Sequence, residues 1–199
     1  MATIKARTYN PEKTRASIIR AGIKLFSSSG YHGTSVGDIA KAAKITKGAF
    51  YHHFQTKEEL LMLIHQQYTD YQIDAVRAVI ANNESPEQQL RELIRCIVEA
   101  VRRYRPNVRI FFQERRYLTR KYLAQADEQR DVLEDAFQLV IENGIASGDF
   151  RQDLDARVVC LGIIGMCAWT YQWFSDKGRL SADEVADNFA ALLLEGLLA

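Results

Sequence analysis

Apolar residues recur along this chain every three or four positions, the spacing that places them on one face of a helix. The alternation of β-branched and polar residues typical of strands is nowhere sustained. Only three prolines and eleven glycines interrupt the 199 residues. The pattern therefore predicts an all-α fold.

Three short helices are expected within residues 1–57. The first runs from Pro11, a favoured first-turn residue, to Ser29 and stops at Gly30. Ser35 can cap a second helix of about nine residues. Thr46 can cap a third helix that reaches residue 54. Their apolar faces predict one small shared core.

Six further helices are expected, which makes nine in all. The first of them opens with a capping box, Thr56 followed by Glu59, and is long enough to join two domains rigidly. The stretch 158–169 is apolar nearly all the way round, so we expect it to be buried on every side. With their cap residues, the six segments are 56–79, 86–105, 106–112, 122–146, 155–169 and 181–197.

Charge divides the chain into the same two parts. Residues 1–57 contain ten Lys and Arg but only two acidic residues, a net charge of +8, whereas residues 58–199 carry a net charge of −7. A basic segment on an acidic body indicates a polyanionic partner, because Lys and Arg release condensed counterions when they neutralise phosphates. We predict two domains, 1–57 and 58–199, the first of which binds nucleic acid.

Several other classes of protein are disfavoured. There is no apolar signal segment and no apolar run approaching the ~20 residues of a membrane span, so we expect a soluble cytoplasmic protein without a membrane partner. The three cysteines lack metal-ligand spacing and are expected to be reduced core residues, and the adjacent His52 and His53 point about 100° apart on a helix. No catalytic motif or phosphate-binding glycine loop appears. We therefore expect neither an enzyme nor a bound metal or cofactor.

The second and third helices, joined by a tight turn, have the proportions of a helix-turn-helix motif, whose second helix enters the major groove of DNA. At the start of that helix, Thr46 and Lys47 can reach base edges or phosphates, and Gly48 lets the backbone approach the duplex. Tyr51 and His52 follow on the outward face. An outward Tyr51 is expected to hydrogen-bond a phosphate.

Four stretches here resemble the tetracycline-repressor (TetR) family: Gly30–Val36, Ile39–Ala40, Thr46–Phe54 and Lys57–Leu60. The resemblance implies a nine-helix repressor in which the residues of the third helix just named line the groove. It also implies that Thr34 or Ser35, together with Lys57, holds phosphates.

One departure from the family is Lys44, which stands in the turn where glycine is usual. Either the turn differs slightly, or the strain of a positive φ at a residue with a Cβ is tolerated. Lys44 can also add a phosphate contact, so its role stays open.

Aromatic residues are numerous in the second domain and suit a cavity between helices, although ordinary core packing accounts for any one of them. Five basic residues, Arg109, Arg115, Arg116, Arg120 and Lys121, can bind a phosphate-rich group or can be a solvated helix face. The leading hypothesis for an effector is a bulky hydrophobic molecule with an anionic part, such as an acyl-coenzyme A thioester. The predicted ligand-binding residues are Tyr68, Tyr71, Phe111, Phe112, Arg115, Arg116, Tyr117, Phe137, Trp169 and Trp173.

A subunit interface is expected on the last two helices. Gly162 and Gly165 each cost roughly 1 kcal/mol relative to alanine inside a helix, so close packing against a second subunit is expected to compensate. The apolar stripe of the final helix adds Val185, Phe189, Leu192 and Leu193 to this interface.

The predicted function is thus a homodimeric repressor that binds a palindromic DNA operator and is released by a small-molecule effector. The alternative is a helical small-molecule carrier or a protein-interaction module without operator binding.

Overall fold

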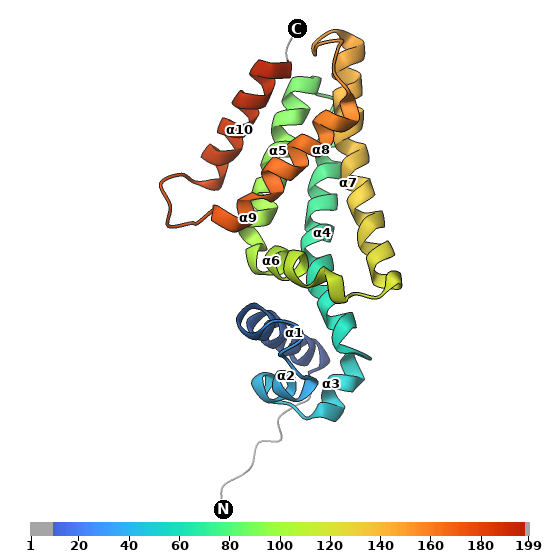
Figure 1. Ribbon diagram of the computed structural model, residues 1–199, viewed down its shortest axis with the longest axis vertical. Helices are drawn as coiled ribbons and strands as arrows, with labels where there is room; N and C mark the ends of the chain where they lie inside the picture. Colours follow the sequence, from blue (N-terminus) through green and yellow to red (C-terminus); the bar gives the residue numbers. More distant parts are fainter. Residues whose placement is uncertain (1–9, 198–199) are drawn as a thin grey trace, which may run out of the picture.

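The computed structural model describes residues 10–197, and over this range the chain is helical without a β-strand (Figure 1). The all-α prediction is confirmed. The described range contains nine helices of seven or more residues, as predicted, together with a single-turn helix and a 3-10 turn that were not predicted. The elements are α1 (Pro11–Ser29), α2 (Val36–Ala43), α3 (Lys47–His53), α4 (Lys57–Ala81), α5 (Pro86–Arg103), α6 (Arg105–Glu114), η1 (Arg115–Tyr117), α7 (Arg120–Ser147), α8 (Ala156–Ala168), α9 (Thr170–Trp173) and α10 (Ala182–Leu197).

The core of α1, α2 and α3 is shared with later helices. Besides Ile18, Ile39 and Phe50 of the first three helices, the same buried cluster contains residues 60–64 of α4 and residues 110–111 of α6. Helix α1 packs closely on α4 at Gly22, where an added Cβ would come within 2.9 Å of a methyl carbon of Leu60. A movement of α4 or α6 therefore reaches α1 through direct packing contacts.

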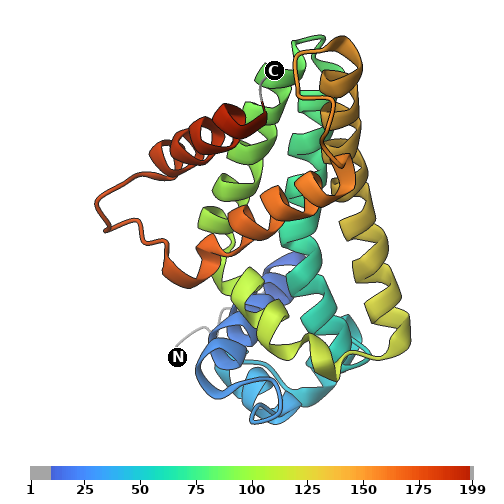
Figure 2. The same cartoon turned by 45° about the horizontal axis from the view of Figure 1, so that its top comes forward.

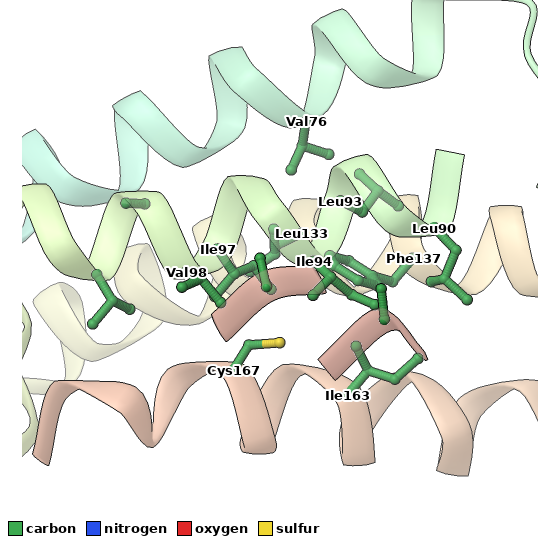
Figure 3. Packing of buried hydrophobic residues seen from close by; sticks show 14 of the residues in the cluster. Val76, Leu90, Leu93, Ile94, Ile97, Val98, Leu133, Phe137, Ile163 and Cys167 are labelled. Carbon is green, nitrogen blue, oxygen red and sulfur yellow. The ribbon is translucent and has the colours of Figure 1, made fainter. Parts of the chain in front are cut away.

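A second core lies in the upper part of the molecule, between α5 and the helices around it. Figure 3 shows Ile94 and Ile97 of α5 facing Phe137 of α7 and Cys167 of α8. Helix α4 runs from the first core into the second, and Figures 1 and 2 show it as the long connection between the two parts. Cys160 and Cys167 are buried, as expected, whereas Cys96 is only partly buried, and the three thiols are free.

Helix α8 differs from the prediction that it is buried on every side. Only Cys160, Ile163 and Cys167 along it are buried, whereas Val158 and Leu161 are exposed. The prediction is wrong for the single subunit, because α8 lies on the outside of the bundle, where one of its faces packs against α5 and α7 and the other does not (Figure 2).

None of the helices within residues 10–197 has both the length and the apolarity needed to cross a bilayer. In the same range, no three His, Cys, Asp or Glu side chains are grouped as metal ligands would be.

Candidate DNA interface and ligand cavity

Capping interactions define the helix-turn-helix. The backbone N–H of Asp38 donates to the Ser35 hydroxyl (3.1 Å) and the backbone N–H of Ser35 donates to the Asp38 carboxylate (3.0 Å), a reciprocal pair that starts α2. The Ser35 hydroxyl also donates to the Asp38 carboxylate (2.5 Å), and this bond, followed by that from the Ser35 N–H, keeps the pKa of Asp38 below its usual range. Thr46 starts α3 by accepting the N–H of Ala49 (3.1 Å). Both caps were predicted from the sequence.

The turn between α2 and α3 contains the one described non-glycine residue with positive φ. Lys44 has φ 58° and ψ 44°, the left-handed conformation that glycine adopts without steric cost. The turn therefore keeps its geometry and tolerates the strain. The Lys44 side chain is exposed and lines an open groove with Lys13 and Thr46, and its contact with a phosphate remains a prediction.

The outward face of α3 carries the residues predicted to read DNA. Phe50 is fully buried and fixes the helix on the core, so Tyr51 lies on the outward face and is 55% exposed. Lys47, Gly48 and His52 are also exposed. The aliphatic part of Lys47 lies beside Gly37, where a Cβ would come within 2.9 Å of Lys47 Cε. The contacts predicted between these exposed residues of α3 and bases or phosphates remain predictions.

Two predicted phosphate ligands have other partners. Thr34 is buried and its hydroxyl donates to the Gly30 carbonyl (2.8 Å), so a phosphate contact through it is ruled out, and of Thr34 and Ser35 only Ser35 is exposed. The Lys57 ammonium donates to the carbonyls of Tyr31 (2.6 Å) and Thr34 (2.7 Å) and lies 4.0 Å from the centre of the Tyr31 ring. Burial lowers the pKa of Lys57, and Glu114 partly offsets that effect. Lys57 thus ties the loop after α1 to the start of α4.

The loop after α1 is also held from α6. The Glu114 carboxylate is buried and accepts the backbone N–H of Tyr31 (3.1 Å). The Tyr117 ring stacks on His32, with centroids 4.9 Å apart, and the Arg116 guanidinium lies 4.9 Å from the Tyr117 centroid. Arg116 and Tyr117, predicted to line a ligand cavity, therefore lie at the junction between the two parts of the chain. Sequence analysis missed Glu114, because no local pattern links it to a loop 83 positions away.

A cavity of about 130 Å³ lies between α4, α6, α7 and α8. Four of the predicted ligand-binding residues line it, namely Tyr68, Phe111, Phe112 and Arg115. The other lining residues are His65, Thr69, Gln72, Ile73, Val108, Ala126, Asp127, Gln129, Arg130, Leu133, Ile164 and Ala168.

The remaining predicted ligand residues do not line this cavity. Tyr71 packs against Tyr104, with ring centroids 5.5 Å apart, and Phe137 is fully buried in the core around α5. Trp169 and Trp173 are half-exposed on the outer surface. The sequence shows that these residues are aromatic and lie on helices. It does not show whether such a residue lines a cavity, packs in a core or lies on an exposed face.

Neutral polar side chains of α4 form one wall of the cavity, and of these sequence analysis assigned only Tyr68. His65 stacks on Phe111 with ring centroids 3.6 Å apart, and burial lowers its pKa to about 3, so its imidazole is neutral at physiological pH. Within residues 10–197, neither His65 Nδ1 nor Gln72 Nε2 has a hydrogen-bond partner, although both are buried. Thr69 donates to Gln129 Oε1 of α7 (3.0 Å).

The charged residues of the cavity are paired with one another. Asp127 lies 3.1 Å from the guanidinium of Arg130 and 3.9 Å from that of Arg115, and Arg130 also pairs with Glu134 (3.0 Å). Their side chains are partly exposed, except that of Glu134. Of the five basic residues predicted to surround a ligand, only Arg115 lines the cavity, since Arg109, Arg116, Arg120 and Lys121 are exposed elsewhere.

The outer faces of α8 and α10 carry exposed apolar residues. On α8, Val158, Leu161 and Trp169 are exposed at helical spacing, and a Cβ added to Gly162 or Gly165 on the same face would meet no atom within 4 Å. The subunit itself therefore gives no packing reason for these two glycines.

On α10, Leu192 is 65% exposed, while Phe189 and Leu193 are half-buried against the core. The structure contradicts the prediction that Val185 lies in the interface, because Val185 is buried inside its own subunit.

Comparison with known proteins identifies the family. Residues 18–63 match the description "Bacterial regulatory proteins, tetR family", and residues 83–197, more than half of the chain, match "Tetracyclin repressor-like, C-terminal domain". The chain belongs to the TetR family. As a TetR-family protein it is a DNA-binding transcription regulator and not an enzyme.

Relatives of this TetR-family protein cover nearly its whole length. It is 28% identical to the HTH-type transcriptional repressor KstR2 of Mycolicibacterium smegmatis, over 94% of this chain and 92% of the relative. The structure of the ketosteroid transcriptional regulator KstR2 of Mycobacterium tuberculosis superposes with a TM-score of 0.84 at 25% identity, over 99% and 97% of the two chains. The structure of AibR in complex with isovaleryl coenzyme A and operator DNA superposes with a TM-score of 0.80 at 28% identity, over 91% and 98%.

Proposed function

We propose that this TetR-family protein is a homodimeric repressor that binds a palindromic operator through α3 and is released from it by a small hydrophobic or anionic effector. The observation that carries the proposal is the face of α3. A buried Phe50 holds this short helix on the core while Lys47 and Tyr51 lie on its exposed side, in the helix position that enters the major groove.

The exposed apolar face of α8 and α10 supports a dimer. Two subunits that cover Leu161, Trp169 and Leu192 would bury side chains that the single subunit leaves in water. The glycines at 162 and 165 would let the two α8 backbones approach closely. Because a two-fold dimer presents two recognition helices related by symmetry, its operator is expected to be palindromic.

Packing between the cavity and the DNA-binding helices supports control by an effector. Phe111 lines the cavity and also belongs to the core that contains Ile18 of α1. A ligand that displaces α6 would thus move α1 as well, and a difference of ~1–3 kcal/mol in its affinity for the two arrangements changes DNA affinity 5- to 150-fold.

An acyl-coenzyme A thioester is the leading example of such an effector. A cavity of about 130 Å³ has room for a short acyl portion alone, so the coenzyme portion would lie outside it, near Arg115 and Arg130. The superposable AibR was solved with isovaleryl coenzyme A, which is the kind of ligand that this arrangement would accept.

Selection of duplexes from a random pool is expected to return palindromes for the wild-type protein. Lys47→Ala should change the base preferred within each half-site, because Lys47 reaches base edges. Tyr51→Phe should weaken binding to all DNA sequences alike, because it removes a phosphate contact. Direct repeats in place of palindromes, or an unchanged preference for Lys47→Ala, would contradict the respective part of the proposal.

Titration of the selected complex with isovaleryl coenzyme A tests the effector. The expected result is release of the DNA, with a weaker effect of free isovalerate, because the acid lacks the phosphates of the coenzyme. Equal potency of the acid and its thioester would remove coenzyme recognition from the proposal.

A further inference from the structure

Two buried polar atoms of the cavity lack partners, although native structures rarely leave such atoms unpaired. His65 is 5% exposed and Gln72 is 4% exposed, yet neither His65 Nδ1 nor Gln72 Nε2 has a partner in hydrogen-bond geometry within residues 10–197. The Gln72 side chain does lie near the Tyr68 hydroxyl, where it partly offsets the rise that burial causes in the pKa of Tyr68. Leaving such a group unpaired costs about 1–3 kcal/mol each. A methionine in place of Gln72 would fill similar space without that cost, so the amide is unfavourable for folding and calls for a reason other than packing.

These two residues belong to one stripe of α4. His65, Tyr68, Thr69 and Gln72 follow at positions i, i+3, i+4 and i+7, and all four line the cavity. The stripe carries no charge, because His65 is neutral and the others do not ionise at neutral pH. The charged residues of the cavity are partly exposed and already paired with each other through Asp127. The buried wall therefore suits an uncharged polar group.

Size limits what the cavity can hold. Its volume is about 130 Å³. Protein cavities of ~150 Å³ accept a molecule as large as benzene. A ring or branched chain of about six carbons matches this volume.

We propose that the cavity selects a compact, uncharged ring or branched carbon chain that carries a carbonyl oxygen, and that the Gln72 amide donates the hydrogen bond that recognises this oxygen. The carbonyl of a ketone and that of a thioester share this chemistry. The inference rests on the cavity being the effector site proposed above, and it adds which part of the effector enters and which residue recognises it.

Three compounds with a six-membered ring test whether the cavity recognises a carbonyl oxygen. Cyclohexanone and methylenecyclohexane have nearly the same size but present a neutral oxygen and no oxygen. Cyclohexanecarboxylate keeps the ring, is slightly larger and presents a charged carboxylate. Binding to the full-length protein without DNA is measured by ligand-observed NMR. Cyclohexanone is expected to bind about tenfold more tightly than methylenecyclohexane, because only the ketone satisfies the buried amide. Equal affinities, tighter binding of the carboxylate, or no binding of the ketone would overturn the proposal.

The variant Gln72→Met separates recognition from structure. We expect it to abolish the preference for the ketone while leaving the thermal midpoint of the ligand-free protein unchanged or higher, since it removes an unpaired buried amide. Gln67→Met, on the same helix but outside the cavity lining, should keep the preference. A retained preference in Gln72→Met would show that the amide does not recognise the carbonyl. A clearly lower midpoint would show that the amide serves structure instead.

A further experiment with a thioester, isovaleryl coenzyme A, tests this inference separately from the proposed repressor function. If isovaleryl coenzyme A fails to release the operator while the ketone preference persists and depends on Gln72, the proposed effector is wrong and the recognition of a carbonyl stands. If release occurs but is indifferent to Gln72→Met, the repressor function stands and the recognition proposed for Gln72 fails.

Discussion

Leu192→Glu is expected to convert the proposed dimer into monomers and to weaken operator binding by about 100-fold or more, because the two half-sites would then be bound independently. Leu192 is 65% exposed in the single subunit, so the new carboxylate stays in water there and the subunit keeps its fold. In a dimer formed through α8 and α10, the same carboxylate would be buried against apolar residues. Sedimentation velocity and a DNA titration measure the two effects.

The control for this variant is Leu139→Glu, which places the same charge on an exposed leucine of α7 (45%). It should remain dimeric and bind the operator normally. A dimeric Leu192→Glu with normal DNA affinity would show that the subunits associate through another surface.

Lys57→Met is expected to lower the free energy of unfolding by about 2 kcal/mol, because the carbonyls of Tyr31 and Thr34 lose the ammonium donor, and the Tyr31 carbonyl keeps only the backbone N–H of Thr34 (3.3 Å). DNA affinity should fall as well, since the loop that precedes α2 loosens. The slope of log affinity against log salt should not change, however, because no phosphate contact is lost. Chemical denaturation and DNA titrations at several salt concentrations measure these quantities.

Lys44→Met provides the comparison. Its ammonium is exposed in the groove beside Thr46, so the variant is expected to reduce the salt slope by about one and to leave stability nearly unchanged. If Lys57→Met reduced the slope and kept full stability, Lys57 would be a phosphate ligand, as the family resemblance implied.

The helices were predictable because their ends depend on local chemistry. Ser35, Thr46 and Thr56 all accept the backbone N–H of the residue three positions ahead, and such pairs are close together in the sequence. The exposed face of α3 could be predicted from the same local geometry, because it lies opposite the buried Phe50.

The cavity and the junction were predicted less well, since they depend on which helices meet. Val185 and Leu192 lie on what the sequence shows as one apolar stripe, but only the packing of α10 on α5 buries the first and exposes the second. Lys57 reaches carbonyls 23 and 26 positions away, and Gln72 is one of several polar residues on α4 until α7 and α8 enclose it.

The core shared by α1, α4 and α6 affects how such regulators can be recombined. A cut at residue 57 follows the change in charge along the chain, but it separates Ile18 and Phe50 from the residues at 60–64 and 110–111 that pack with them. A DNA-binding segment transplanted at that point would lack part of its own hydrophobic core. It would also lack Glu114, whose carboxylate accepts the backbone N–H of Tyr31. Exchange of operator specificity between relatives is therefore best achieved by replacing the exposed residues of α3 alone, because the hydrophobic core that supports α3 is formed by residues from both sides of position 57.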